Sequence, residues 1–168
     1  MAIAISLEQY LNGQGIAHDE LNHKPTNCAA RSASVSHVSA DSMAKGVVLS
    51  SKTGFFLAVV PASRQVSLGN VGRRLKQTVA LATEPEIKSL FPDCELGAVP
   101  PIGAAYGLRM IVDDELETQA DIYFEGGDHR TLVHVAGKDF VRLMHAAPHG
   151  WISAEDQESG MEAGYFGA

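Results

Sequence analysis

Hydrophobic positions along the chain form two patterns: short, continuous or alternating runs, and stretches with helical spacing. Apolar runs at residues 45–49 and 55–60 flank residues 50–54, which predicts a β-hairpin with a loop of about five residues. Residues 122–124 and 131–135 flank Gly126-Gly127-Asp128 and predict a second hairpin. Further strands are expected at residues 16–23 and 108–112, and helices at 6–13, 28–37, 67–76, 83–90 and 137–144. Strands and helices mixed in this order predict an α+β fold.

Three of the expected helices begin with a capping signal. Ser6 followed by Gln9 has the spacing of a capping box, in which each side chain satisfies a free backbone N–H group. Ser67 is expected to cap the helix at 67–76. Thr83, followed by acidic residues that include Glu86, has the pattern of a cap and a negatively charged first turn. These signals predict where the three helices begin.

The composition is that of a globular protein. Hydrophobic residues make up 45% of the 168 residues and charged residues 20%, which excludes a disordered, collagen-like or coiled-coil chain. No apolar run approaches the roughly 18 residues of a membrane span, and the first residues lack the basic start of a signal peptide. We therefore expect one cytoplasmic domain over residues 1–152, no membrane partner, and a flexible acidic, glycine-rich tail over 153–168.

Charge and cysteine usage narrow the classes of function. The net charge of −7 argues against a protein that grips DNA or long stretches of RNA, because phosphate neutralisation favours basic proteins. A contact with only one end of a nucleic acid is compatible with it. Cys28 and Cys94 form neither a metal motif nor a disulfide framework, and we expect both to pack as small hydrophobic residues. His145 and His149 lack a partner at metal-ligand spacing, so we expect neither a metal nor another cofactor.

Two segments carry candidate chemistry. Lys45 shares a strand face with Val47 and Leu49, and its amine suits a phosphate, a carboxylate or a developing oxyanion. It equally fits a strand-end lysine that reaches solvent. Residues 97–103, Gly-Ala-Val-Pro-Pro-Ile-Gly, predict a stiff loop whose carbonyl and glycine N–H groups can orient a small ligand, since proline restricts the backbone. An ordinary turn before a strand has the same composition.

The tip of the second hairpin, Gly126-Gly127-Asp128-His129, is a third candidate. Histidine is the usual acid–base group near neutral pH, although a solvated turn is the simpler interpretation. The chain lacks a Gly-x-Ser-x-Gly elbow, a Walker loop, a Gly-x-Gly-x-x-Gly motif and a His-Glu-x-x-His motif. Nucleotide-dependent enzymes and enzymes with a protein nucleophile are therefore disfavoured.

Taken together, these segments resemble the YbaK family. Residues 44–49 (Ala-Lys-Gly-Val-Val-Leu), the Gly-x-x-Pro-Pro-x-Gly loop at 97–103 and residues 122–129 occur in the family's order and spacing. His23-x-Pro25-Thr26 before a small-residue helix also matches. The resemblance spans residues 7–151. The family includes free-standing relatives of the editing domain that is inserted in bacterial prolyl-tRNA synthetases.

The resemblance implies a single compact α+β domain around a mixed, partly barrel-like sheet. It also implies an enzyme that hydrolyses, without a metal, the ester between a wrong, small amino acid and the terminal adenosine of tRNA. Its partners would be the aminoacyl-tRNA 3′ end and an aminoacyl-tRNA synthetase. Members that remove alanine have a Phe-His-Pro pattern where Glu125-Gly126 follow Phe124 here. The amino-acid preference of that branch is therefore not implied.

The resemblance further assigns roles to residues. Lys45 matches the family's lysine near the tRNA 3′ end, and the 97–103 loop matches the segment that positions the ester. The hypothesis is that Lys45 anchors a phosphate or ribose, the loop orients the ester, and a water attacks. The site residues expected are Lys45 and Gly103 (catalytic), Thr26, Gly97, Val99, Pro100, Pro101, Gly127, Asp128 and His129 (substrate binding), and Arg64, Arg73, Arg74 and Lys76 (phosphate contacts). These basic residues also fit the solvated face of an amphipathic helix.

Two other functions fit the same residues. A binding module for a small ligand, an RNA 3′ end or a partner protein would use the same pocket without catalysis. An unrelated small-molecule hydrolase would use His129 and Asp128. Hydrolysis that is lost with Lys45→Ala supports editing, whereas hydrolysis that is lost only with His129→Ala supports the unrelated hydrolase.

Overall fold

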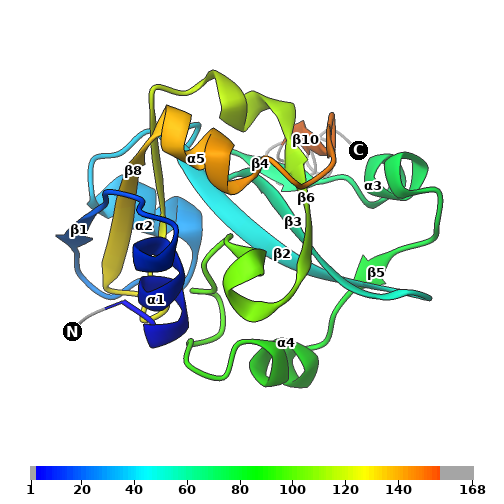
Figure 1. Ribbon diagram of the computed structural model, residues 1–168, viewed down its shortest axis with the longest axis horizontal. Helices are drawn as coiled ribbons and strands as arrows, with labels where there is room; N and C mark the ends of the chain where they lie inside the picture. Colours follow the sequence, from blue (N-terminus) through cyan, green and yellow to red (C-terminus); the bar gives the residue numbers. More distant parts are fainter. Residues whose placement is uncertain (1–2, 156–168) are drawn as a thin grey trace, which may run out of the picture.

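The computed structural model describes residues 3–155, which form one domain around a mixed β-sheet (Figure 1). Neighbouring strands follow the order β1-β8-β7-β2-β3-β6-β9, and β5 pairs with β2. The strands of this sheet are β1 (Asp19–Asn22), β2 (Met43–Ser51), β3 (Gly54–Pro61), β5 (Ala80–Leu81), β6 (Arg109–Asp113), β7 (Asp121–Glu125), β8 (Thr131–Ala136) and β9 (His149–Gly150). A second sheet pairs β4 (Arg64–Val66) with β10 (Ser153–Glu155).

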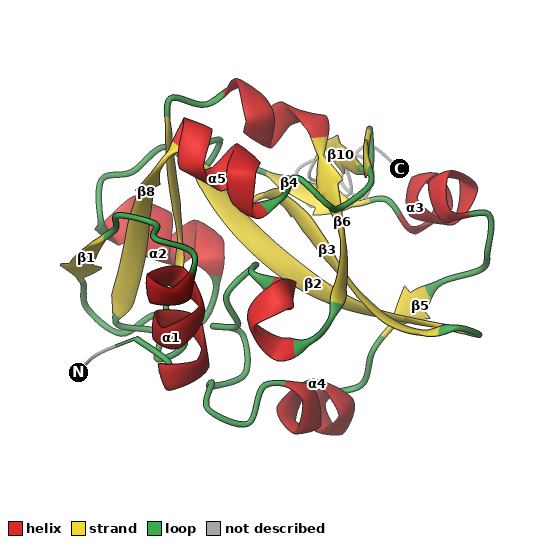
Figure 2. Cartoon of the chain, in the orientation of Figure 1, coloured by secondary structure: helices red, strands yellow, loops and turns green. Residues whose placement is uncertain are grey.

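Helices cover both faces of the main sheet (Figure 2). The α-helices are α1 (Ile5–Gly13), α2 (Ala29–Val35), α3 (Leu68–Leu75), α4 (Glu84–Leu90) and α5 (Gly137–Leu143), and two short 3-10 helices are η1 (Gly103–Tyr106) and η2 (Asp114–Thr118). Side chains alternate along a strand, so each strand contributes to both faces. Leu57 and Phe124 pack in the main core with α1 and α5, whereas Leu49 and Val60 pack with Val71 of α3 on the opposite side.

The expected single α+β domain with a mixed, partly barrel-like sheet is confirmed. β2 pairs in parallel with β7, and β3 with β6, while β2–β3 and β7–β8 are antiparallel. In Figure 1, β8 crosses the direction of β2 and β3 steeply, so the sheet bends around the core. No helix among residues 3–155 is long and apolar enough to cross a membrane.

Two local predictions are corrected by contacts between distant segments. Helix α1 begins after Ala4, not Ser6, and the N–H of Ser6 donates to Oδ2 of Asp93 at 2.9 Å, so a carboxylate from another loop replaces the expected capping box. The first hairpin turns within two residues, because β2 and β3 pair as far as Ser51 and Gly54. The caps of α3 by Ser67 and of α4 by Thr83 with Glu86 are confirmed.

The ends of the chain and the cysteines add two observations. Ser153–Glu155, the first residues of the expected tail, form β10, and the rest of that tail lies outside the described residues. Cys94 is half-buried, as expected of a small hydrophobic residue, and burial raises the pKa of its thiol to about 12. The prediction for Cys28 is wrong, because this residue is exposed at the start of α2.

Candidate functional site

The 97–103 loop packs directly against β2, one residue from Lys45. A Cβ atom placed on Gly46 would lie 3.3 Å from Cα of Pro101 and 2.9 Å from Cδ1 of Leu57, so the loop and the strand approach more closely than a larger residue allows. β2 pairs with β7 before this point and with β5 after it. The loop therefore packs on the Gly46 face of β2, beside a stretch of the strand's edge that neither β7 nor β5 covers.

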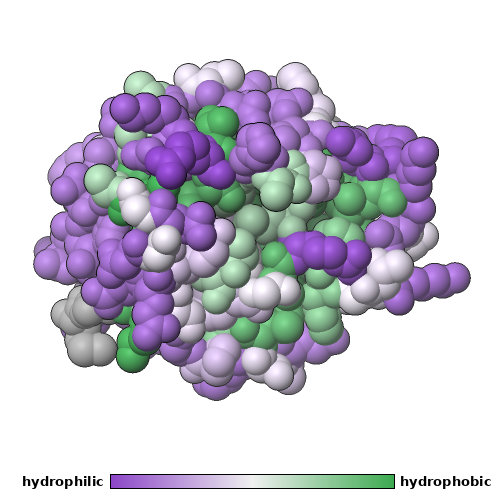
Figure 3. All heavy atoms as spheres, viewed as in Figure 1, coloured by the Kyte–Doolittle hydropathy of each residue, from purple (hydrophilic) through white to green (hydrophobic). Residues whose placement is uncertain are grey.

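A small apolar pocket of about 240 Å³ opens at this edge. Its lining comes from β2, from the segment around β5 and α4, and from the loop: Gly46, Val47, Val48, Leu81, Ala82, Ile87, Gly97 and Val99. The volume lies below the roughly 300–1,000 Å³ of pockets that enclose drug-sized ligands. Figure 3 shows mostly hydrophobic residues in the middle of this face of the molecule, bordered by hydrophilic ones. The pocket therefore suits a small apolar group.

Lys45 stands beside this pocket but does not line it. Strand alternation places its half-buried side chain on the face of Val47 and Leu49, opposite Gly46 and Val48. The pocket takes residues from both faces because it opens on the edge of the strand. The flexible four-carbon stem of the lysine thus begins one residue from the pocket.

Gly103, expected to be catalytic, is buried at the start of η1. Its N–H group lies 3.1 Å from Sδ of Met110, and a Cβ atom there would lie 2.7 Å from Cγ of the same methionine. Ile102 is also buried, so this end of the loop is anchored in the main core. The structure thus packs Gly103 in the core, whereas Gly97 at the other end of the loop is exposed.

Gly97 is the point where three segments of the chain meet. Its φ of +82° is a left-handed conformation, and a Cβ atom there would lie 3.0 Å from the carbonyl oxygen of Asn27 and 3.1 Å from Cε1 of His129. Nε2 of His129 lies 2.5 Å from the carbonyl oxygen of Leu96, and the N–H of Thr26 donates to the carbonyl of His129. The predicted substrate-binding residues Thr26, Gly97 and His129 are therefore brought together.

Gly127 and Asp128 hold the turn of the second hairpin. Oδ1 of Asp128 accepts hydrogen bonds from the N–H groups of Arg130 and Thr131, each at 2.9 Å, and Oδ2 accepts one from the hydroxyl of Thr131 at 3.1 Å. The backbone of Gly127 has φ +118°, which favours glycine. Asp128 bonds to its own turn and not to His129, so the geometry gives no support to a His129–Asp128 hydrolytic pair.

No sequence pattern singled out a buried polar chain next to this junction. Glu125 is only 3% exposed, and its Oε1 accepts a hydrogen bond from the hydroxyl of Ser32. Oγ of Ser32 lies 2.5 Å from Oγ1 of Thr26. Burial raises the pKa of Glu125, and this effect outweighs the hydrogen bond from Ser32 and the charges of His23 and His129, which lower it. The one signal in the sequence was the position of Glu125, an acidic residue that directly follows the apolar strand residue Phe124.

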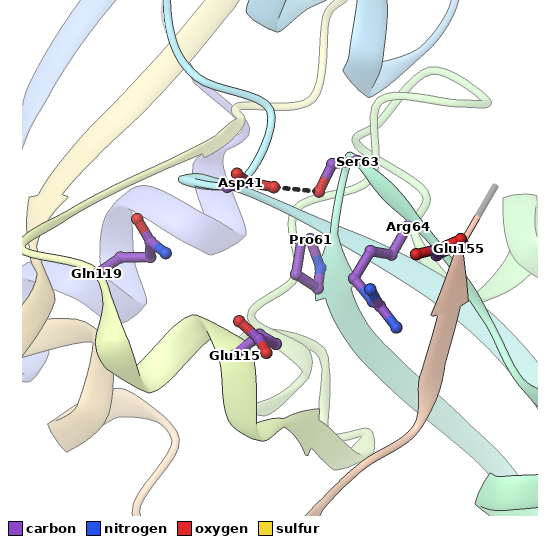
Figure 4. Close-up of a pocket in the computed structure, with 7 residues that line it drawn as sticks. All are labelled: Asp41, Pro61, Ser63, Arg64, Glu115, Gln119 and Glu155. Carbon is purple, nitrogen blue, oxygen red and sulfur yellow. Dashed lines mark hydrogen bonds between the residues drawn. The ribbon is translucent and has the colours of Figure 1, made fainter.

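Arg64 lies in a different, acidic pocket of about 270 Å³ (Figure 4). This pocket is lined by Asp41, Pro61, Ser63, Arg64, Glu115, Gln119 and Glu155. Nε of Arg64 donates to Oγ of Ser153 at 2.8 Å, and its guanidinium lies over the ring of Trp151. The carboxylates around it repel a phosphate. Arg64 therefore ties β4 to β10 in surroundings that do not favour the predicted tRNA contact.

The other predicted phosphate contacts lie at the C-terminal end of α3. Arg73 bonds to the side chain of Asn70, and Nε of Arg74 donates to the carbonyl of His149 at 2.9 Å. Lys76 follows the helix in a left-handed conformation. Arg73 and Lys76 thus keep the exposed positions that a phosphate contact needs, while Arg74 also fastens α3 to β9.

Within residues 3–155, three side chains are arranged so that they could hold a metal ion: Asp114, Glu117 and His149. Nδ1 of His149 lies 2.6 Å from Oε1 of Glu117, and both acids are exposed. His145 is not part of this group. Exposed acids beside a histidine form an ordinary ion pair, and the group lies away from the 97–103 loop in sequence and contacts.

Comparisons with known proteins agree with this geometry. A family model described as the aminoacyl-tRNA editing domain matches residues 23–143. A solved structure of a hypothetical protein is similar, with a TM-score of 0.78 and 22% identity over 89% of this chain and 99% of that one. A proposed trans-editing enzyme for prolyl-tRNA synthetase is similar too, with a TM-score of 0.78 and 21% identity over 89% of this chain and 95% of that one.

A third structure extends the comparison to a longer protein. A proposed signal-transduction protein from Marinobacter aquaeolei has a TM-score of 0.75 and 15% identity, covering 97% of this chain but 35% of that one. No curated protein matches the chain. At these identities the solved structures show the fold, whereas the family model covers most of the sequence. The chain belongs to the aminoacyl-tRNA editing domain family, of which the YbaK proteins are members.

Proposed function

We propose that this protein hydrolyses the ester that joins a small amino acid to the 3′-terminal adenosine of a mischarged tRNA. One observation carries the proposal: the 97–103 loop and β2 form a small apolar pocket at the edge of β2, one residue from Lys45. Family membership supports the editing role, and the volume of the pocket supports a small amino acid side chain.

The reaction needs little more than orientation. An aminoacyl ester is already activated, so positioning and electrostatics can supply the catalysis without a protein nucleophile. The side chain of the amino acid enters the apolar pocket, the loop backbone near Gly97 orients the ester, and Lys45 binds the terminal phosphate or ribose. A water oxygen adds to the ester carbonyl carbon, the bond to the ribose oxygen breaks, and that oxygen takes up the proton.

A separate editing site corrects errors that a single binding site cannot avoid, because one site discriminates only weakly between similar amino acids. The aminoacylation site of a synthetase distinguishes amino acids that differ by one methylene by only about 1–3 kcal/mol of binding free energy. A small second pocket rejects large amino acids by exclusion, which complements the first selection. The net charge of −7 fits a protein that contacts only the tRNA end, with Arg73 and Lys76 as exposed cations at the C-terminal end of α3. The protein would act in the cytoplasm, in trans to a synthetase. One similar structure is described as a proposed trans-editing enzyme for prolyl-tRNA synthetase.

Release of amino acids from a panel of aminoacyl-tRNAs tests the proposal. Wild type should release one or a few small amino acids, and Lys45→Ala should slow that release by about tenfold or more. Lys52→Ala, which changes an exposed lysine at the hairpin turn, is the matched control and should keep wild-type rates. Melting temperatures of both variants should stay within about 2 °C of wild type.

The outcomes separate the three functions. Release that persists in Lys45→Ala but is lost in His129→Ala would indicate the unrelated hydrolase. Binding of the tRNA 3′ end with no release from any substrate would indicate the binding module. A large fall in the melting temperature of Lys45→Ala would show that the lysine is structural, and that result contradicts its assigned role.

A further inference from the structure

A chain of three side chains connects a buried carboxylate to the junction at Gly97. Glu125 and Ser32 are buried, at 3% and 0% exposure, and Thr26 is half-buried. The hydroxyl of Ser32 bonds to Oε1 of Glu125, and Oγ1 of Thr26 lies 2.5 Å from Oγ of Ser32. Asn27, which follows Thr26, places its carbonyl oxygen against the backbone of Gly97, a residue of the pocket.

Chemistry fixes the direction of these hydrogen bonds while Glu125 is ionised. A carboxylate oxygen only accepts, so the Ser32 hydroxyl must donate its proton to Glu125. Each hydroxyl has one proton, so Ser32 can only accept from Thr26, and Thr26 must donate to Ser32. Oγ1 of Thr26 therefore keeps only lone pairs for any other partner. The direction is the same when Glu125 carries a proton on Oε2, whereas a proton on Oε1 would make Glu125 the donor to Ser32; Thr26 is therefore held as an acceptor only while Oε1 is unprotonated.

Further acceptor atoms lie around this chain. Nδ1 of His23 lies 2.6 Å from the carbonyl of Lys24, and Nε2 of His129 lies 2.5 Å from the carbonyl of Leu96, so in each neutral ring the proton sits on that nitrogen. The other ring nitrogens, Nε2 of His23 and Nδ1 of His129, are buried and have no hydrogen-bond partner within the described part of the chain. Oε2 of Glu125 is likewise buried and has no hydrogen-bond partner among the described residues.

A region that offers lone pairs on a threonine, two imidazoles and a carboxylate favours a ligand that is cationic and carries several N–H donors. The N–H of Thr26 donates to the carbonyl of His129 and the N–H of His23 to the carbonyl of Arg130, so these acceptors share one region. In the reaction proposed above, one substrate group has both properties: the α-ammonium of the amino acid, which is attached next to the ester carbonyl.

We infer that Oγ1 of Thr26, held as an acceptor by Ser32 and Glu125, binds the α-ammonium group of the aminoacyl substrate. This inference rests on the proposed function. Thr26 touches the substrate, whereas Ser32 and Glu125 are positioning residues. The consequence is a preference for ends with a free amino group, so that a tRNA carrying an N-blocked amino acid or a peptide is a poor ligand for the site.

Two non-hydrolysable compounds isolate this contact. 3′-Alanylamino-3′-deoxyadenosine and 3′-propionylamino-3′-deoxyadenosine differ only by the ammonium group, and their amide linkage resists hydrolysis. Isothermal titration calorimetry of wild type should show the alanyl compound binding about tenfold or more tightly than the propionyl compound, as a charge-assisted hydrogen bond predicts. Thr26→Val and Ser32→Ala should reduce this ratio to within about twofold.

Matched variants separate recognition from folding. Thr26→Ser keeps the hydroxyl and should keep the ratio. Ser34→Ala, at an exposed position of the same helix, should also keep it. A merely structural role for Ser32 would weaken both compounds equally and leave the ratio unchanged, so the ratio reports on the ammonium contact even if affinities fall.

Three results would overturn the inference: no binding of either compound by wild type, equal binding of both, or an undiminished ratio in both Thr26→Val and Ser32→Ala. Failure of the proposed function has a different signature. If the ratio behaves as expected but no aminoacyl-tRNA is hydrolysed, the ammonium site stands and the catalytic proposal falls.

Discussion

Replacing Gly97 by alanine tests whether the position of the 97–103 loop depends on a backbone that favours glycine. The residue has φ +82°, and the added Cβ atom would lie 3.0 Å from a backbone oxygen of Asn27 and 3.1 Å from the ring of His129. The backbone oxygen cannot move without displacing the segment before α2. The substitution therefore strains the loop, the Thr26–Asn27 segment and the second hairpin at once.

The expected cost has two parts. A left-handed conformation costs an L-residue with a Cβ atom roughly 1–2 kcal/mol, and the tight contacts bring the total to about 1–3 kcal/mol. In a chain of this length each kcal/mol lowers the melting temperature by about 2–4 °C, so we expect a fall of about 2–12 °C. Movement of the loop relieves the strain, so hydrolysis should fall more steeply than stability.

Gly107→Ala supplies the control. Gly107 has φ +69° but nothing within 4 Å of an added Cβ atom, so this variant carries the backbone cost without the contacts. Thermal and urea unfolding of both variants, with aminoacyl-tRNA hydrolysis measured in parallel, separates the two parts. If Gly97→Ala loses no more stability than Gly107→Ala and keeps full hydrolysis, the loop does not depend on this junction and the reasoning is refuted.

Three further predictions concern groups whose environment the fold sets. Burial raises the pKa of Glu125 above 4.5, so the native state binds the proton more tightly than the unfolded state, and the stability that Glu125 contributes falls as pH rises through the native pKa. The stability of Glu125→Gln relative to wild type, measured by urea unfolding, should therefore rise over that pH range. A stability difference that does not change with pH would refute this prediction. Asp93→Ala should cost about 1–2 kcal/mol by thermal unfolding, because Ser6 at the start of α1 loses its carboxylate partner; an unchanged melting temperature would show that the contact is dispensable. Iodoacetamide at pH 8 should alkylate exposed Cys28 well before Cys94, whose pKa is about 12, and mass spectrometry of the native protein would expose the opposite order.

Much of the site followed from local motifs. Lys45 and the 97–103 loop were predicted to lie together because they resemble segments of one family. The contact between Gly46 and Pro101 places the loop beside that strand, on the face opposite the Lys45 side chain. Thr26, Gly97 and His129 do meet, as expected of substrate-binding residues. Gly103 and Asp128 make packing and turn contacts, and a short motif does not distinguish such contacts from ligand binding, so their assigned roles stay predictions.

What the sequence determines by itself is the order and type of the longer elements, because periodicity and caps such as those at Ser67 and Thr83 act within a few residues. Tertiary structure alone decides which polar groups lose water and which distant partner each one meets. Glu125 and Ser32 are 93 positions apart, and Ser6 and Asp93 are 87 apart. Such partners are chosen when the sheet and helices pack, since an unpaired buried polar group is costly, and that requirement selects across the whole chain rather than along it.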